Sequence, residues 1–365
     1  MRAAVLDRPG TALRVEELEV DPPGPGEVLV RMAASGVCHS DLHRADGDWG
    51  PVPPTVLGHE GSGVVEAVGE GVGEPSLRQL VALNWYYPCL ACEACHLGRQ
   101  WLCTGTKALE HRLPDGSTRL HRADGSEVLP YLALGTFGER AVVAAQAAVP
   151  VPDAVPPEVA ALIGCAVTTG VMAVLRTAEV PAGASVAVIG LGGVGLSVVM
   201  GTALAGAGTI VAVDRVPEKL ERAGELGATD VVLAGDNPRV TRRAIAARTG
   251  GGPEFAFEAI GLPATIELTI EAVRPGGTAV LVGLTKLDDR ASFDAFSLVD
   301  QSKRVVGSNY GWSIPQVDFP RLARMYLAGR LPIDKLIDGR IGLEDINGAF
   351  DAMRRGEGLR KVVVF

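Results

Sequence analysis

The sequence lacks the features that mark membrane, nucleic-acid-binding and secreted proteins. No stretch reaches the ~18 unbroken apolar residues of a membrane helix, and the start, Met1–Asp7, lacks the apolar core of a signal peptide. Lys and Arg are scattered, and the net charge of −9 argues against nucleic acid or an anionic membrane as the main partner. We therefore expect a cytoplasmic protein whose cysteines are thiols or metal ligands and not disulfides.

Aromatic residues are scarce, at 5%, whereas the apolar fraction is 47% and Gly and Ala are abundant. This composition favours closely packed α/β structure over an aromatic-rich binding surface. There is no internal repeat and no low-complexity tract. At ~100–200 residues per domain, the 365 residues suggest two domains, with three as the alternative.

Cysteine is the most informative residue type. Four of the six cysteines fall within fifteen residues, as Cys-x2-Cys-x2-Cys-x7-Cys at Cys89, Cys92, Cys95 and Cys103. Such steps let tight turns present thiolates to one tetrahedral zinc ion. An iron–sulfur cluster is a rival because Cys-x2-Cys-x2-Cys also occurs there, but no Pro follows Cys103 and no second cluster is present. A set of buried or oxidised cysteines is disfavoured by the clustering. We predict a closed, structural zinc site.

The other two cysteines lie in glycine-rich surroundings. Cys38 stands in Gly36–His43, Cys165 in Gly164–Gly170, and Gly58-His59-Glu60-Gly61 lies between them. Alone, each cysteine would be interpreted as a small core residue. Together, two thiolates and one imidazole form an open catalytic zinc site with a fourth position for water or substrate.

A glycine motif in strand–turn–helix context predicts a dinucleotide site. The apolar run Ser185–Ile189 leads into a turn with Gly190, Gly192, Gly193, Val194 and Gly195, followed by a helical stretch, Leu196–Ala207. These glycines permit a tight turn, close approach of a pyrophosphate to the backbone and close helix packing. A Gly-rich turn that binds nothing is the alternative, and the register of strand, helix and a following acid disfavours it.

The acid is Asp214, which ends the next apolar strand, Thr209–Val213, 19 residues after Gly195. A carboxylate there binds both hydroxyls of the adenosine ribose and repels a 2′-phosphate, so we predict NAD as the cofactor and not NADP. The neighbouring Arg215 weakens this preference, since an Arg can accept such a phosphate.

The layout predicts an α/β protein with a doubly wound parallel sheet and a second, mostly β domain. We expect a catalytic domain at 1–166 with a metal lobe at about 85–135, hairpins at 104–135, a nucleotide-binding domain at 167–308, and a return to the catalytic domain at 309–365. Further expected strands are Val231–Leu233, Glu254–Glu258, Thr278–Val282, Arg304–Val306 and Lys361–Phe365. Expected helices are Glu218–Glu225, Arg239–Ala247, Ala264–Ala272, Phe319–Ala328 and Leu343–Met353.

These motifs, in this order, resemble the zinc-containing medium-chain alcohol dehydrogenases over nearly the whole chain. The likeness is greatest to the branches acting on long-chain, glutathione-linked and aryl alcohols, which carry two zinc ions. It rests on Gly36–His43, Gly58–Gly61, the four-Cys lobe, Gly190–Gly195 and the closing Leu359–Phe365. The resemblance implies a GroES-like catalytic domain, a Rossmann domain, and a homodimer or homotetramer acting on a small alcohol or aldehyde.

The resemblance also assigns roles to single residues. It makes Cys38, His59 and Cys165 the catalytic zinc ligands, Glu60 an alternate ligand, and Asp41 the residue that orients His59. Ser40 takes the proton of the alcohol, and His43 ends a relay through the nicotinamide ribose. The implied cofactor contacts come from His39 and Arg360 at the pyrophosphate, Thr169 and Val194 at the nicotinamide, and Lys219 at the adenosine ribose. Trp49 and Trp85 line the alcohol pocket in this assignment, with plain core packing as the alternative.

The expected reaction is therefore hydride transfer between a primary or secondary alcohol and NAD. One alternative is a thiol-adduct formaldehyde dehydrogenase of the glutathione type, which shares the scaffold and differs at the mouth of the pocket. The second alternative is a non-catalytic member of the family that senses nucleotide or zinc. The intact zinc-ligand and relay residues argue against this alternative.

Overall fold

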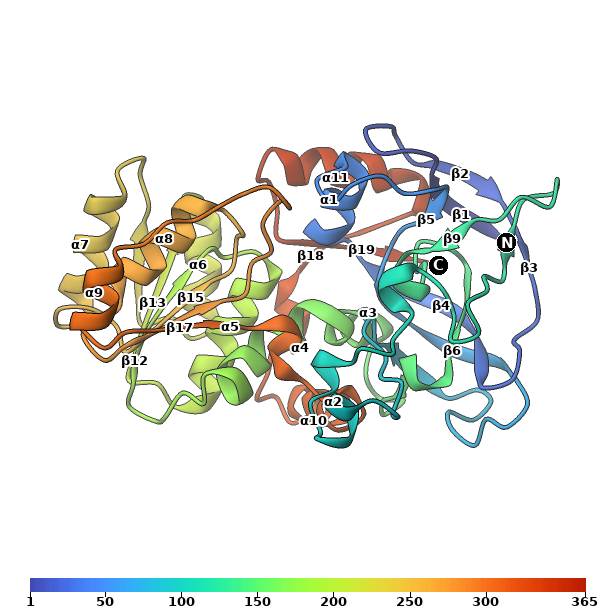
Figure 1. The fold of residues 1–365 in the computed structure, drawn as a ribbon, viewed down its shortest axis with the longest axis horizontal. Coiled ribbons are helices and arrows are strands. Elements are labelled where there is room, and N and C mark those ends of the chain that lie inside the picture. Colours follow the sequence, from blue (N-terminus) through green and yellow to red (C-terminus); the bar gives the residue numbers. More distant parts are fainter. The chain divides into compact units, whose positions relative to one another are not determined.

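The computed structural model describes residues 1–365, which form two compact units. The first contains Met1–Ala166 and Ile314–Phe365, and the second contains Val167–Ser313. Figure 1 shows the course of the chain, coloured from the N-terminus to the C-terminus.

The second unit is built on a six-stranded sheet in which all neighbouring strands are parallel, in the order β14-β13-β12-β15-β16-β17. Its strands are β12 (Ser185–Ile189), β13 (Thr209–Asp214), β14 (Asp230–Leu233), β15 (Phe255–Glu258), β16 (Thr278–Leu281) and β17 (Arg304–Gly307). Its helices are α4 (Thr168–Met172), α5 (Gly193–Ala205), α6 (Pro217–Glu225), α7 (Pro238–Arg248), α8 (Pro263–Ala272) and α9 (Ala295–Asp300). The predicted doubly wound sheet is confirmed: apolar runs with crossover helices form the strands, and the central ones, β12, β13, β15 and β16, are largely buried.

The first unit is mostly β, as predicted. One sheet has the order β11-β7-β6-β4-β19-β18, with β10 also paired to β4, and a second has the order β2-β1-β5-β9. The strands are β1 (Arg2–Leu6), β2 (Arg14–Glu17), β3 (Glu19–Val20), β4 (Glu27–Gly36), β5 (Thr55–Val56), β6 (Glu60–Val68), β7 (Leu80–Leu83), β8 (Leu120–His121), β9 (Leu129–Pro130), β10 (Arg140–Ala144), β11 (Ala148–Pro150), β18 (Ile337–Ile341) and β19 (Arg360–Val364). Its α-helices are α1 (His39–Asp46), α2 (Glu93–His96), α3 (Pro157–Leu162), α10 (Pro315–Leu327) and α11 (Ile346–Arg354).

The C-terminal strand ties the tail to the centre of this unit. β19 pairs antiparallel with β4, so that Val362 lies opposite Gly36. Val362 and Val363 of β19 are both fully buried, so the strand is covered on both of its faces. The tail thereby brings Arg360 to the end of β4 from which the first candidate zinc ligand follows.

The expectation of hairpins at 104–135 is confirmed in part, because one short hairpin forms at 120–128. Around Asp124-Gly125, His121 of β8 pairs antiparallel with Glu127, and the Val128 amide donates to the Leu120 carbonyl, while β8 also pairs with β3. At Asp115-Gly116 a tight turn forms, closed by the Leu113 amide donating to the Ser117 carbonyl. Two short 3₁₀ helices, η2 (Ala108–Glu110) and η3 (Tyr131–Ala133), also lie in this segment. Asp-Gly turns favour a reversal of the chain, and here the paired backbone on either side of the turn is only a few residues long.

One helical stretch, Pro157–Thr177, is long and apolar enough by composition to cross a membrane. It runs through α3, the π-helical segments η5 (Ile163–Val167) and η6 (Ala173–Thr177), and α4 between them. Because 83% of its most apolar window is buried inside the protein, its apolar character is that of a core helix.

Candidate active site

Three buried side chains converge in the first unit: Cys38, His59 and Cys165. Their ligand atoms all lie within 4.8 Å of one another. Each of the three residues is less than 8% exposed. Two sulfur atoms and one imidazole nitrogen at this spacing fit an open zinc site with three protein ligands.

The fold brings these residues together from three distant parts of the sequence. Cys38 follows the end of β4 and precedes α1, and His59 immediately precedes β6. β4 and β6 are paired with Gly36 opposite Glu60, so both ligands emerge at one end of the same strand pair. Cys165 lies in the π-helical segment η5, an irregularity that is frequent at functional sites.

The position before His59 requires glycine. Gly58 has a φ of +88°, in the left-handed region. A Cβ there would lie 2.7 Å from the backbone nitrogen of Phe137, closer than real Cβ contacts allow. A larger residue would therefore displace His59 from the other two ligands.

Asp41 fixes the orientation of the imidazole. Its carboxylate is fully buried and accepts hydrogen bonds from His59 Nδ1 at 2.9 Å, from the Gly58 amide at 3.0 Å and from the Cys38 amide at 3.2 Å. With Nδ1 held in this way, Nε2 is left to bind a metal, the arrangement usual for zinc-bound histidine. The Asp41 carboxylate thus links two of the three ligand positions.

A second buried carboxylate stands behind the same cluster. Glu60 Oε1 accepts the Ala166 amide at 2.8 Å, and Oε2 lies 3.4 Å from Arg360 Nη1. Burial raises the pKa of Glu60 to about 7, and the guanidinium of Arg360 opposes that rise. Arg360 is itself only 5% exposed and donates from Nη1 to the Val37 carbonyl at 2.7 Å.

Helix α1 carries the other predicted residues of this site. Ser40 is half-buried, and its carbonyl accepts from the Tyr131 hydroxyl at 3.5 Å. His43 Nδ1 lies 2.7 Å from Asp48 Oδ2, and the Trp49 ring is stacked on the imidazole with 5.0 Å between centroids. His39 is exposed on the same helix.

The two tryptophans predicted to line the pocket have different surroundings. Trp49 lies on His43, within the candidate site. Trp85 is half-buried, packs against both apolar core clusters of the first unit, and meets Tyr86 edge to face at 5.4 Å. Core packing thus accounts for much of the burial of Trp85, and its contact with substrate remains a prediction.

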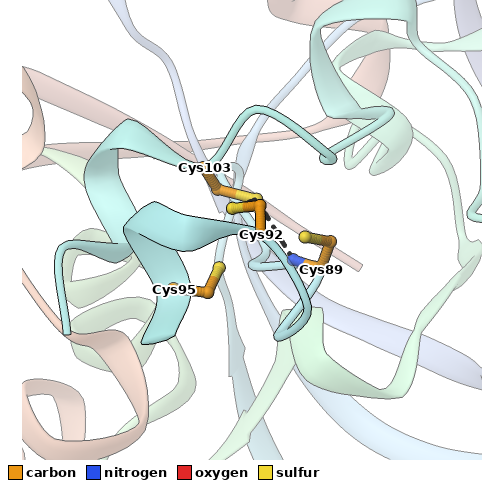
Figure 2. Close-up of side chains that lie close together, drawn as sticks. All are labelled: Cys89, Cys92, Cys95 and Cys103. Carbon is orange, nitrogen blue, oxygen red and sulfur yellow. Dashed lines mark hydrogen bonds between the residues drawn. The ribbon is translucent and has the colours of Figure 1, made fainter. Parts of the chain in front are cut away.

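The four-Cys lobe is shown in Figure 2, where the four side chains gather at one point. The sulfur atoms lie within 4.8 Å of one another, and the Cys89 amide donates to Cys103 Sγ at 3.2 Å. Backbone amides of Cys95 and Thr104 lower the pKa of Cys92 to about 5, whereas burial raises the pKa of Cys95 to about 12. Four crowded sulfurs cannot all ionise without a compensating cation, and four sulfur ligands are the donor set of a closed structural zinc site.

The second unit contains the glycine loop. β12 ends at Ile189, Gly190 takes a φ of +92°, and α5 begins after Gly192, so the N-terminus of α5 follows the turn. Helix α4 packs closely on this helix: a Cβ at Gly170 would lie 2.5 Å from the Val194 carbonyl oxygen. Thr169 and Val194 are both half-buried. A helix N-terminus preceded by glycines is suited to bind a pyrophosphate.

Asp214 closes this loop at the end of β13. Its Oδ2 accepts the Leu191 amide at 2.7 Å, and its Oδ1 accepts the Val216 amide at 3.0 Å. The carboxylate is thus held at the end of the strand, beside the loop. Arg215 is exposed and lies 3.3 Å from Asp236, whereas Lys219 is half-buried on α6.

Two family models match the chain. Residues 24–153 match the alcohol dehydrogenase GroES-like domain, and residues 193–327 match the zinc-binding dehydrogenase domain. The NDMA-dependent alcohol dehydrogenase of Amycolatopsis methanolica is 38% identical, over 100% of this chain and 98% of its own. The S-(hydroxymethyl)glutathione dehydrogenase of Synechocystis sp. is 36% identical over 99% of both chains. Benzyl alcohol dehydrogenase from Acinetobacter calcoaceticus, a crystal structure, is 31% identical, with a TM-score of 0.92, over 100% of this chain and 99% of its own.

The chain belongs to the zinc-containing medium-chain alcohol dehydrogenases. It is an oxidoreductase that acts on alcohols and binds zinc. The family model described as zinc-binding covers residues 193–327 and not the four-Cys lobe, so zinc at Cys89, Cys92, Cys95 and Cys103 stays a prediction. The alcohol dehydrogenase activity of this family also argues against the alternative that the chain is a non-catalytic sensor of nucleotide or zinc.

Sequence reasoning missed three residues of this enzyme that the fold brings to the site. Asp48 contacts His43; Tyr131 meets the His59 ring edge to face at 5.6 Å; His111 lies against Tyr131 at 5.2 Å. The last two come from the segment that was expected to form hairpins. No motif surrounds them, and only the Asp48 position, five residues from His43, carried a local signal.

We expect His111 to make the stability of the enzyme depend on pH. Burial lowers the pKa of His111 from 6.5 to about 4, and Nδ1 accepts the Leu132 amide at 3.1 Å, so the folded protein keeps the ring neutral. The unfolded chain binds the proton near its ordinary pKa, so stability falls as the pH drops from about 6.5 to 4. We expect a loss of up to about 3 kcal/mol from this group.

The measurement is urea unfolding of the parent and His111→Gln at pH 7 and pH 4.5. Gln can still accept the Leu132 amide but does not titrate, so the variant should lose less stability between the two pH values. Other groups titrate equally in both proteins, and identical pH dependence in parent and variant would show that His111 does not contribute.

Proposed function

We propose that this enzyme transfers hydride reversibly between a primary or secondary alcohol and NAD, with the alcohol bound at the Cys38, His59 and Cys165 cluster. The observation that carries the proposal is this buried cluster, with ligand atoms within 4.8 Å and with Asp41 holding the imidazole of His59. A panel of aliphatic, aromatic and terpenoid alcohols, followed by NADH absorbance, tests it.

Two zinc ions per chain are part of the proposal. The three-residue cluster would hold a catalytic ion, and Cys89, Cys92, Cys95 and Cys103 would hold a structural one. Bound at the open site, zinc supplies Lewis acidity to the oxygen of the alcohol. Glu60 lies beside this site, where its buried carboxylate is suited to an alternate ligand role. Metal analysis of the purified enzyme should return two zinc ions per chain.

The chain's own residues manage the proton of the alcohol. Ser40 and His43 are three residues apart on α1, and this spacing places them on one face of the helix. The Ser40 hydroxyl is proposed to accept the proton of the alcohol, and His43 Nε2 to release it toward solvent. His39 and Arg360 are proposed to neutralise the pyrophosphate, Arg360 from its buried place beside Glu60.

The second unit is proposed to bind NAD through its glycine loop, and the nicotinamide supplies the hydride chemistry. Thr169 and Val194 shape the nicotinamide site in this proposal, and Lys219 reaches the adenosine ribose. Asp214 selects NAD because its carboxylate would repel a 2′-phosphate. The charge of Arg215 is partly offset by Asp236, at 3.3 Å, which weakens its attraction for such a phosphate.

We therefore expect Asp214→Ser to narrow the preference for NAD over NADP by about 10- to 100-fold, through loss of the ribose contacts and of the repulsion. The measurement is kcat/KM for both cofactors at one saturating alcohol concentration. Glu225→Gln on α6, whose carboxylate pairs with Arg222 and not with Arg215, is the matched control and should change the ratio much less. A parent enzyme that uses NADP as well as NAD would contradict the proposal.

A second candidate substrate is the adduct of formaldehyde with a thiol. It is favoured by the 36% identity to a relative described as S-(hydroxymethyl)glutathione dehydrogenase. Comparing kcat/KM for free primary alcohols with kcat/KM for S-hydroxymethylglutathione separates the two candidates.

We further propose that the enzyme self-associates as a homodimer or homotetramer. β17 is an outer strand of the parallel sheet and exposes Val305, and α9, which precedes it in the chain, exposes Phe296 and Val299. An exposed strand edge with apolar neighbours is suited to pairing with a second copy. The molar mass in solution checks this, and a monomer would contradict it.

A further inference from the structure

The end of helix α1 brings Asp48 back onto His43. Gly47 ends the helix with a φ of +86°, and its amide donates to the His43 and Arg44 carbonyls. The Asp48 amide then donates to the His43 carbonyl at 3.0 Å. This is the pattern of a Schellman motif, which turns the chain back over the last helical turn. The Asp48 carboxylate also contacts the imidazole of His43, with 2.7 Å between Asp48 Oδ2 and His43 Nδ1.

Both groups of this pair are shielded from solvent. The side chains of His43 and Asp48 are 22% and 15% exposed. The Trp49 ring covers a face of the imidazole, with an interplanar angle of 29°. Arg44 donates to the Trp49 carbonyl at 3.2 Å, and its guanidinium lies 6.0 Å from the indole centroid. The imidazole is therefore held at one nitrogen and on one face.

The side-chain contact is not needed to end the helix. The turn is closed by backbone amides and by the left-handed conformation of Gly47, neither of which uses the Asp48 carboxylate. A residue with a neutral side chain could close the same turn. The contact between the carboxylate and the imidazole is thus an additional feature, and its effect falls on His43.

We propose that Asp48 is a positioning residue for proton release, holding His43 as the tautomer with its proton on Nδ1. A carboxylate accepts hydrogen bonds and does not donate them, so Nδ1 must be the donor and Nε2 keeps its lone pair. Nε2 takes the proton, the carboxylate compensates the charge of the imidazolium, and Nε2 then returns the proton to water or a buffer base. The inference rests on the proposed role of His43 in alcohol oxidation.

The first test is spectroscopic and needs no substrate. Long-range proton–nitrogen NMR spectra of the zinc-loaded enzyme report the tautomer of each histidine, and His43→Ala identifies the signals of His43. We expect the Nδ1–H tautomer in the parent and a mixture of tautomers in Asp48→Asn, because an amide can both donate and accept. The same tautomer in both proteins would overturn the proposal.

The second test is kinetic and uses the same variants with NAD and a primary alcohol at neutral pH. We expect Asp48→Asn to lower kcat by about 3- to 30-fold, less than the about 10²-fold of His43→Ala, since a positioned base contributes at least that much. KM for both substrates should change little, and added buffer base should restore part of the rate. In the His43→Ala background, Asp48→Asn should change kcat by less than about twofold.

Asp46→Asn is the matched control. Asp46 ends the same helix and pairs with Arg354 at 2.6 Å, and it makes no contact with the imidazole. It should leave the tautomer and kcat unchanged. Equal losses from Asp48→Asn with and without His43 would show that Asp48 does not act through the imidazole. If the parent oxidises no alcohol, the proposed function fails, and the NMR result still decides whether Asp48 sets the tautomer.

Discussion

Replacing Cys38 with alanine is expected to lower kcat for alcohol oxidation by at least about 10³-fold, because Lewis-acid stabilisation of several kcal/mol is lost and each factor of ten corresponds to about 1.4 kcal/mol. Cys38 is one of only three side chains whose ligand atoms converge at the proposed catalytic site. With one sulfur removed, the remaining Cys165 and His59 form an incomplete donor set. Steady-state kinetics with NAD and a primary alcohol measure the loss.

Zinc content and nucleotide binding separate this loss from unfolding. The variant should keep the zinc ion of the four-Cys lobe, so metal analysis should fall from two ions to one per chain. NAD binding should persist, because the glycine loop belongs to the other compact unit. Cys165→Ala should have a similar effect, and the double variant should be little worse than either single one. Turnover within about tenfold of the parent with both zinc ions retained would contradict the assignment.

Cys103→Ser is expected to act on stability, with a fall in the melting temperature of roughly 10 °C or more, because closed zinc sites contribute several kcal/mol to folding. Cys103 is the most deeply buried of the four cysteines, and its sulfur accepts the Cys89 amide. The lobe has little regular structure: α2 has four residues, and Leu90 and Gly98 both take positive φ values. Without the metal, few other interactions hold these turns.

His96→Ala is the control for this prediction. His96 lies on α2 beside Cys95, is exposed, and belongs to neither metal-ligand group. It should keep both zinc ions and the parent melting temperature. Thermal unfolding and metal analysis are measured on the same samples of both variants. Unchanged stability with full zinc content in Cys103→Ser would show that the four cysteines do not form a structural site.

Local sequence patterns predicted the elements whose structure depends on residues close together in the chain. Each of these patterns spans only a few residues. They are the spacing of the four cysteines, the glycines after β12 and the apolar runs of the six parallel strands. They predicted the doubly wound sheet, and β12 to β17 form with ends within a residue or two of those expected. The expected helix Leu196–Ala207 in fact begins at Gly193, because α5 follows directly from the glycine turn.

The contacts missed from the sequence are those that join distant residues. Glu60 and Arg360 are 300 residues apart and meet because β19 pairs with β4. Tyr131 and His111 reach the site through an irregular segment that carries no periodic pattern. Even Asp48, which is near His43 in the chain, contacts it through a helix cap whose geometry depends on the φ of Gly47. Composition and periodicity carry no information on such pairings.

The central claim is that the Cys38, His59 and Cys165 site oxidises alcohols with zinc and NAD. The most direct measurement is the rate of NADH formation from a panel of primary and secondary alcohols by the purified enzyme, with the zinc content of each sample determined during stepwise chelation. The account predicts NADH formation by enzyme with two zinc ions per chain and loss of the rate as the ion of the three-residue site is removed. Zinc-replete enzyme that forms no NADH from any alcohol in the panel, or a rate that persists after both ions are gone, would contradict it.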